Sequence, residues 1–89
     1  MNFTATFVEL LGTFIFLSVI LLTGNPLAIG AALTVLIYLG IDVSGGHFNP
    51  AVTIMTLFNK GISPDTAVGY IVAQIVGGLA AATLNTMMK

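Results

Sequence analysis

The first apolar segment, residues 3–23, limits the fold of this chain more than any other feature. Glu9 is its one charged residue. A helix needs roughly 20 mostly apolar residues to cross the hydrocarbon core of a bilayer, and this segment is long enough. Two further apolar segments follow, at about residues 27–43 and 66–87. The pattern therefore predicts three membrane-spanning helices.

The composition agrees with a membrane protein. The chain has 89 residues, of which 57% are hydrophobic and 6% are charged, and its mean hydropathy is +1.11. About a quarter of the residues in a soluble domain are usually charged, so two lysines, two aspartates and one glutamate cannot cover a soluble surface. We expect an all-α, multi-pass protein of a plasma or inner membrane, with the lipid bilayer as a partner. A secretory signal peptide is the alternative for the N-terminus, but no basic residue precedes Lys60.

The charged and reactive residues exclude several classes of function. The chain has no arginine and a net charge of -1, which disfavours a nucleic-acid partner. With no cysteine and a single histidine, we expect no metal site and no cofactor. There is no carboxylate pair and no nucleophile beside a base, so we expect that the protein is not an enzyme.

A polar, glycine-rich stretch interrupts the apolar segments at residues 44–52 and reads S-G-G-H-F-N-P-A-V. The apolar run that follows it, residues 49–59, has about half the length of a membrane span, which favours a re-entrant segment over a spanning one. Irregular chain at membrane depth is tolerated where protein buries it or where it lines a water-filled path. Residues 44–59 therefore predict a re-entrant loop and half-helix beside a pore.

The residue types of this loop indicate how it would line such a path. Gly45 and Gly46 permit backbone conformations closed to other residues, so the carbonyl groups from Ser44 through His47 can form a ladder of acceptors. Asn49 stands at an N-cap position, and Pro50 suits the first position of a helix. The half-helix then brings its positive end to mid-membrane, which repels cations and helps a pore to exclude protons. We interpret His47 as a structural or carbonyl-orienting residue, with a pH gate as the alternative.

Polar and small residues inside the predicted spans suggest internal contacts. Glu9 lies on one helix face, where N–H groups of irregular chain satisfy it or where it stays neutral; the alternative is a position near the headgroups. Gln74 either holds a loop or joins two helices. The third span carries a small-residue stripe, which is typical of close helix packing in lipid; its members are Gly69, Ala73, Gly77 and Ala81.

The chain resembles the aquaporin and glycerol-facilitator family, the major intrinsic proteins, in three segments. Residues 44–53, S-G-G-H-F-N-P-A-V-T, are similar to the family's first Asn-Pro-Ala loop. Residues 9–14, E-L-L-G-T-F, and residues 70–77, Y-I-V-A-Q-I-V-G, are similar to its first and third helices. The resemblance implies that residues 1–89 form one aquaporin-like half-repeat, made of three transmembrane helices and one re-entrant half-helix.

The resemblance also implies roles for individual residues. Asn49 donates to the passing solute, and Pro50 and Ala51 hold two half-helix tips together. Glu9 and Gln74 support the loop. The residues implied to line the pore through carbonyl groups or at its constriction are Gly45, Gly46, His47, Ile29 and Val52, the last standing where the family's second repeat carries an arginine.

The departures from the family pattern shape the expected function. One Asn-Pro-Ala is present, so the expected partner is a second inverted half-repeat, either an antiparallel copy of this chain or a missing C-terminal half, within a higher oligomer. We expect a passive channel for water or small neutral solutes such as glycerol, and the apolar Ile29 suits a wider passage. The alternative is a non-conducting subunit or incomplete fragment that pairs through the small-residue stripe. Asp42 stands where many relatives have histidine, and nothing in the sequence explains it.

Overall fold

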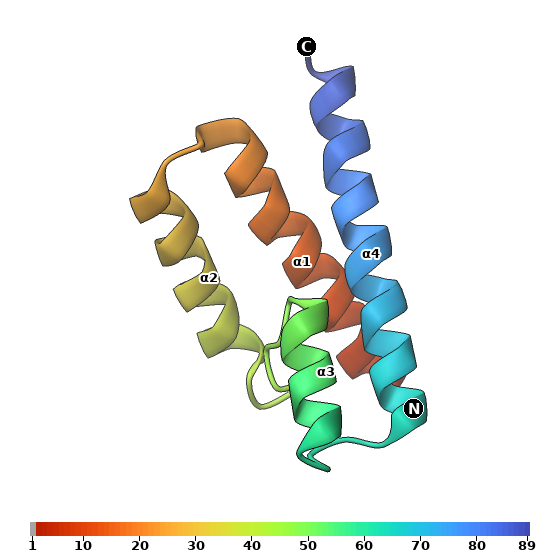
Figure 1. The fold of residues 1–89 in the computed structure, drawn as a ribbon. Helices are drawn as coiled ribbons and strands as arrows, with labels where there is room; N and C mark the ends of the chain where they lie inside the picture. Colours follow the sequence, from red (N-terminus) through yellow and green to blue (C-terminus); the bar gives the residue numbers. More distant parts are fainter. Residues whose placement is uncertain (1) are drawn as a thin grey trace.

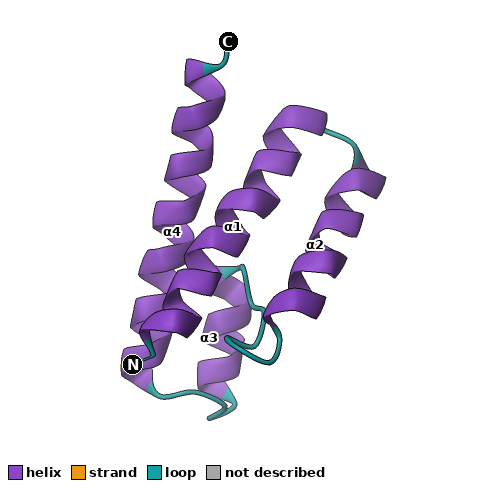
Figure 2. Ribbon diagram, turned by 180° about the vertical axis from the view of Figure 1, so that it is seen from behind, coloured by secondary structure: helices purple, strands orange, loops and turns teal. Residues whose placement is uncertain are grey.

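The computed structural model describes residues 2–89 as four helices (Figure 1). They are α1 (Phe3–Thr23), α2 (Pro26–Gly40), α3 (Pro50–Phe58) and α4 (Pro64–Met87). The described residues contain helices and loops and no strand (Figure 2). Helix α1 packs against α2 on one side and against α4 on the other, and the short α3 packs against α4. The all-α fold expected from the sequence is confirmed.

Local capping explains where most of the helices begin. The side chains of Asn2 and Asn25 accept hydrogen bonds from backbone N–H groups in the first turns of α1 and α2, at 3.1 and 3.0 Å. Gly24 ends α1 with a left-handed φ of 56°, a conformation that glycine adopts without steric cost. The turn at Gly24, Asn25 and Pro26 makes α1 and α2 antiparallel neighbours (Figure 1).

Two helix boundaries differ from the sequence prediction. Helix α2 ends at Gly40 and not at residue 43, because residues 41–44 form a turn whose N–H groups bond back to Ile37 and Gly40. Helix α4 begins at Pro64, two residues before the predicted start, with Ser63 as its N-cap. Each correction follows from hydrogen bonds at a helix end, where hydropathy carries little information.

Two of the described helices are long and apolar enough to cross a membrane, Phe3–Thr23 and Pro64–Met87. Helix α2 is apolar but has 15 residues, fewer than the roughly 20 that a perpendicular span requires. A third span therefore stays a prediction. Helix α3, with 9 residues, has the half-span length expected for the re-entrant segment.

The small-residue stripe of α4 packs inside the chain, against α1. Ala73, Gly77 and Ala81 are buried there, and Gly69 is half-buried. A Cβ atom on Gly77 would lie 2.5 Å from the carbonyl oxygen of Leu10 on α1, so the two backbones touch at this glycine. The stripe is therefore not available to a partner subunit, and the alternative that relied on it for pairing is wrong on this point.

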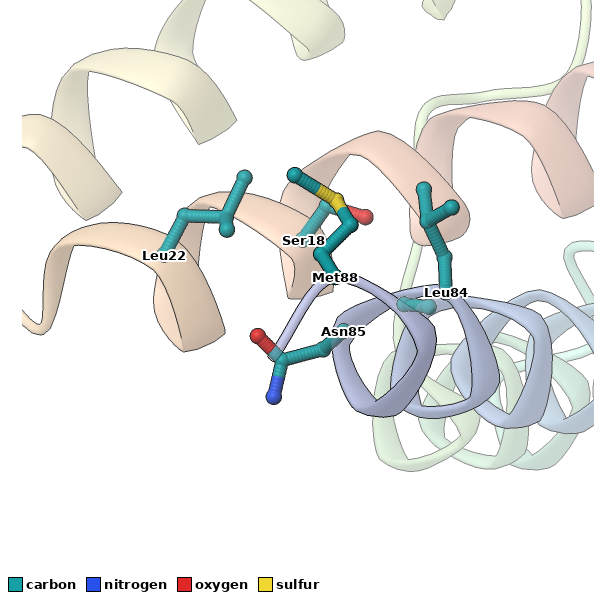
Figure 3. Close-up of a pocket in the computed structure, with 6 residues that line it drawn as sticks. Ser18, Leu22, Leu84, Asn85 and Met88 are labelled. Atoms are coloured by element: carbon teal, nitrogen blue, oxygen red, sulfur yellow. The ribbon is translucent and has the colours of Figure 1, made fainter.

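A small pocket lies at the other end of the α1–α4 interface from the polar loop (Figure 3). It has a volume of about 10 Å³, which is room for about one water molecule. Its lining is mostly apolar, with Ser18 and Asn85 as the polar members. Its size and position exclude it from the site described below.

Candidate functional site

The polar loop (residues 44–49) folds back between the end of α2 and the start of α3, close to α1 and α4 (Figures 1 and 2). Three of its residues have left-handed φ angles: Gly45 at 92°, Gly46 at 62° and Phe48 at 52°. Glycine accepts such angles freely, whereas Phe48 does so against a steric cost. The loop therefore needs strong contacts to hold its shape.

Glu9 of α1 is the main anchor of the loop. Its carboxylate is fully buried and accepts four hydrogen bonds. Oε2 accepts from the Ser44 hydroxyl at 2.6 Å and the His47 backbone N–H at 3.0 Å, while Oε1 accepts from the Phe48 backbone N–H at 2.7 Å and Gln74 Nε2 at 2.9 Å. All four partners are donors, so both oxygens act as acceptors, as in an ionised carboxylate. The contacts agree with the expectation that N–H groups of irregular chain satisfy Glu9, and its depth relative to the headgroups stays a prediction.

Gln74 of α4 extends the network from α1 to α3. Its Nε2 group donates both to Glu9 Oε1 and to Thr53 Oγ1, each at 2.9 Å. Thr53 Oγ1 in turn lies 2.8 Å from Nδ1 of His47. Thr53 accepts from Gln74 and can either donate to His47 Nδ1 or accept from it, because a hydroxyl oxygen has two acceptor lone pairs. Gln74 thus joins three helices and also supports the loop through Thr53 and Glu9.

Tyr70 of α4 fixes the start of the loop. Its hydroxyl donates to the Ser44 carbonyl oxygen at 2.7 Å, and its ring meets the His47 ring edge to face at a centroid distance of 5.2 Å. Tyr70 therefore takes one of the two acceptor positions of the Ser44 carbonyl, the first member of the predicted ladder of acceptors, and the ladder stays a prediction. Among residues 2–89, no donor is bonded to the carbonyl groups of Gly45, Gly46 or His47.

Asn49 and Pro50 begin the half-helix as N-cap and first residue. The side-chain Oδ1 of Asn49 accepts from the Ala51 backbone N–H at 2.8 Å, which leaves its amide group without an acceptor in the described part of the chain. Asn49 and Ala51 are exposed, and Pro50 and Val52 are half-buried. The positive end of α3, with an exposed amide donor, is therefore turned away from the buried network.

Ile29 is the predicted site residue that the structure does not bring to the loop. It lies near the N-terminal end of α2, while the loop follows the other end of that helix. Two residues that support the loop were not singled out from the sequence, Thr53 and Tyr70. One signal pointed to Tyr70, because it lies four residues before Gln74 and so shares one face of α4 with it. In the described residues, no cluster of three or more metal-ligating side chains occurs.

Known proteins match this chain over most of its length. A family model described as "Major intrinsic protein" matches residues 18–89. The chain is 48% identical over 82 residues to glycerol uptake facilitator protein-like 6 of Lactiplantibacillus plantarum, a match that covers 82% of this chain. It is 39% identical over 90 residues to aquaporin-B of Dictyostelium discoideum, covering 85% of this chain, and 44% identical over 59 residues to the lens fiber major intrinsic protein of Gallus gallus, covering 66%. The matches span 38%, 31% and 22% of these three relatives, respectively.

Proposed function

Because this chain belongs to the major intrinsic protein family, we propose that it forms one half of a passive transmembrane pore for water or small neutral solutes. The chain is an integral membrane protein, as its relatives and its two apolar helices indicate. The relatives carry the names of facilitators and aquaporins and not of enzymes, which agrees with the expectation from the sequence.

The observation that supports this proposal is the two-sided character of the polar loop. Its inner side is bonded to Glu9 and Tyr70, and through His47 and Thr53 to Gln74. The carbonyl groups of residues 45–47 and the amide of Asn49 have no partner among residues 2–89. At membrane depth, such free groups require water or a polar solute. A row of acceptors that ends at a donor suits a molecule that both donates and accepts, such as water or glycerol.

Charge selection follows from the end of α3. The N-terminus of a helix carries roughly half a positive elementary charge, and here it begins at the exposed Asn49. This end repels a passing cation and orients a neutral molecule with its oxygen toward Asn49. Pore selectivity of this kind acts on protons and metal ions while neutral solutes pass.

The rest of the pore comes from a second inverted half-repeat. We propose three spanning helices for this half, with Pro50 and Ala51 against the tip of the opposing half-helix and with Ile29 and Val52 at a constriction completed by the partner. The partner is either a C-terminal half or an antiparallel copy of this chain. A higher oligomer then surrounds each pore with lipid-facing helices.

Asn49→Asp tests the pore. Aspartate caps a helix about as well as asparagine, so the fold is retained, while the donor is removed and a negative charge is added beside the path. Stopped-flow light scattering of proteoliposomes, with water and glycerol gradients, should report reduced flux or a proton leak. Asn59→Asp, at the exposed other end of α3, is the matched control. Equal flux in the wild type and in Asn49→Asp would contradict the proposal.

The absence of cysteine provides a test of the partner. Lys60 is exposed in the turn after α3, so Lys60→Cys gives a unique label site. An antiparallel copy requires labelling by a membrane-impermeant reagent from both faces of intact vesicles. Labelling from one face alone excludes the antiparallel copy and assigns the second half to another polypeptide segment.

A further inference from the structure

Phe48 is the apolar residue of the polar loop, and its ring is wedged between α1 and α2. It is 2% exposed. Glycines form the seat of the ring on both helices: a Cβ atom on Gly12 would overlap the ring, lying 2.6 Å from Cδ1, and one on Gly40 would lie 2.9 Å from Cζ. Real Cβ atoms essentially never approach other atoms so closely. The two glycines therefore form a socket that accepts the ring and no additional methyl group.

The backbone of Phe48 is held as firmly as its ring. Its N–H group donates to Glu9 Oε1 at 2.7 Å, and its φ of 52° lies in the left-handed region. That conformation costs an L-residue roughly 1–2 kcal/mol and persists when surrounding contacts over-determine it. Asn49 is the next residue, so the direction in which the chain leaves Phe48 sets the place of the Asn49 amide.

Open space adjoins the ring and its glycine seat. An apolar cavity of about 200 Å³ is bounded by Phe48 together with residues of α1 and α2. The other members of its lining are Val8, Leu11, Gly12, Ile15, Leu36, Leu39 and Gly40. If the ring is pushed from the glycine socket, this cavity is where it can move, and Asn49 must then follow.

We propose that Phe48 is a positioning residue, seated by Gly12 and Gly40, that fixes the Asn49 amide at the solute path and so determines which solutes pass. The inference rests on the proposed pore for its functional consequence. Its structural part, that the ring and the two glycines control the place of Asn49, holds whether or not the chain conducts.

A coupling experiment tests the structural part. The ¹⁵N-labelled chain is studied in detergent micelles, and the Asn49 side-chain amide signal is assigned by its loss in Asn49→Asp. Gly12→Ala should shift this signal and lower the midpoint of unfolding. In a Phe48→Val background Gly12→Ala should change neither the Asn49 signal nor the midpoint of unfolding, because the ring atoms that the new Cβ would meet are gone.

Gly77→Ala is the matched control, since its new Cβ would lie nearest to the Leu10 carbonyl oxygen, at 2.5 Å, and would not meet Phe48. Its loss of stability should be the same in the wild-type background and in the Phe48→Val background. If Gly12→Ala does not fold, the double variant that carries both Gly12→Ala and Phe48→Val should fold and give a dispersed ¹⁵N spectrum. Equal effects of Gly12→Ala in both backgrounds, an unmoved Asn49 signal or no restoration would each overturn the inference.

The functional part is read from solute selection. Phe48→Val should change the ratio of glycerol to water permeability in proteoliposomes, whereas Gly78→Ala, which meets a flexible end of Leu17, should not. If the chain conducts nothing but the Asn49 signal shows the expected coupling, the pore fails and the positioning role stands. If the chain conducts with an unchanged ratio in Phe48→Val, the role of Phe48 in selectivity is refuted and the pore stands.

Discussion

Glu9→Gln is the substitution that best tests how the loop is held. The glutamine side chain has nearly the same shape as glutamate, but one oxygen becomes an N–H₂ group. All four partners of Glu9 are hydrogen-bond donors, so the amide nitrogen must face two of them. The Ser44 hydroxyl can turn and accept, whereas the His47 backbone N–H cannot. The favoured arrangement therefore places the amide nitrogen at the former Oε2 position and leaves the His47 N–H without a partner.

The size of the loss follows from these contacts. A buried donor left unsatisfied costs about 1–3 kcal/mol, and a hydrogen bond to a charged group exceeds a neutral one by roughly 1 kcal/mol. The Phe48 and Gln74 bonds are both weakened in this way. A neutral side chain is easier to bury than a charge, which offsets part of the loss. We expect a net decrease in the free energy of unfolding of about 2–4 kcal/mol, a large fraction of the roughly 5–15 kcal/mol typical of folded domains.

Unfolding of the chain in mixed micelles by increasing dodecyl sulfate, followed by circular dichroism, measures this change. Thr13→Val is the matched control, because Thr13 lies one turn along the same face of α1 and its buried hydroxyl has no partner among the described residues. Removing that hydroxyl should leave stability unchanged or slightly higher. If the free energies of unfolding of Glu9→Gln and Thr13→Val agree within about 0.5 kcal/mol, the range of a neutral surface change, the carboxylate does not anchor the loop.

Three further predictions concern single contacts. Gly77→Ala should destabilise the α1–α4 pair by about 1–3 kcal/mol, the usual cost of overpacking, because its Cβ would lie 2.5 Å from the Leu10 carbonyl oxygen. An unfolding midpoint equal to that of Gly78→Ala would contradict the close contact. Thr53→Val should change the ¹⁵N shift of His47 Nδ1, because this atom lies 2.8 Å from the Thr53 hydroxyl, and an unchanged shift would show that the two groups are not hydrogen-bonded. Tyr70→Phe should release the Ser44 carbonyl group and speed hydrogen exchange of the loop amides, and exchange rates equal to those of the wild type would show that the Tyr70 hydroxyl does not hold the loop.

The starts of α2 and α3 could be predicted from the sequence because their signals are local. Asn25 and Asn49 each precede a proline, and a side-chain acceptor followed by proline begins a helix by contacts within a few residues. The end of α2 had no such signal, since Ile41 and Val43 continue the apolar run beyond Gly40. The turn there depends on the loop that follows it, which is held by residues of other helices.

The contacts that support the loop could be predicted in part. The burial cost of a charge indicated that Glu9 needs partners, and irregular chain was an obvious source of N–H groups. The role of Tyr70 could not be read in this way, because its hydroxyl reaches a carbonyl group 26 residues away and no local pattern records that distance. The socket of Phe48 could not be predicted from the sequence for the same reason. Gly12 and Gly40 belong to different helices, and both contact a side chain from a third segment.

The contacts of the polar loop explain how an Asn-Pro-Ala segment can be held inside the chain and still need polar partners. The buried network satisfies the N–H groups of His47 and Phe48, so residues of the chain itself hold the loop. The carbonyl groups of residues 45–47 and the Asn49 amide have no partner among residues 2–89, and lipid cannot satisfy them. A second half that supplied only apolar surface would bury these groups without partners, at a cost of several kcal/mol for each. The arrangement therefore favours a partner that leaves a watery path along the loop over one that closes against it.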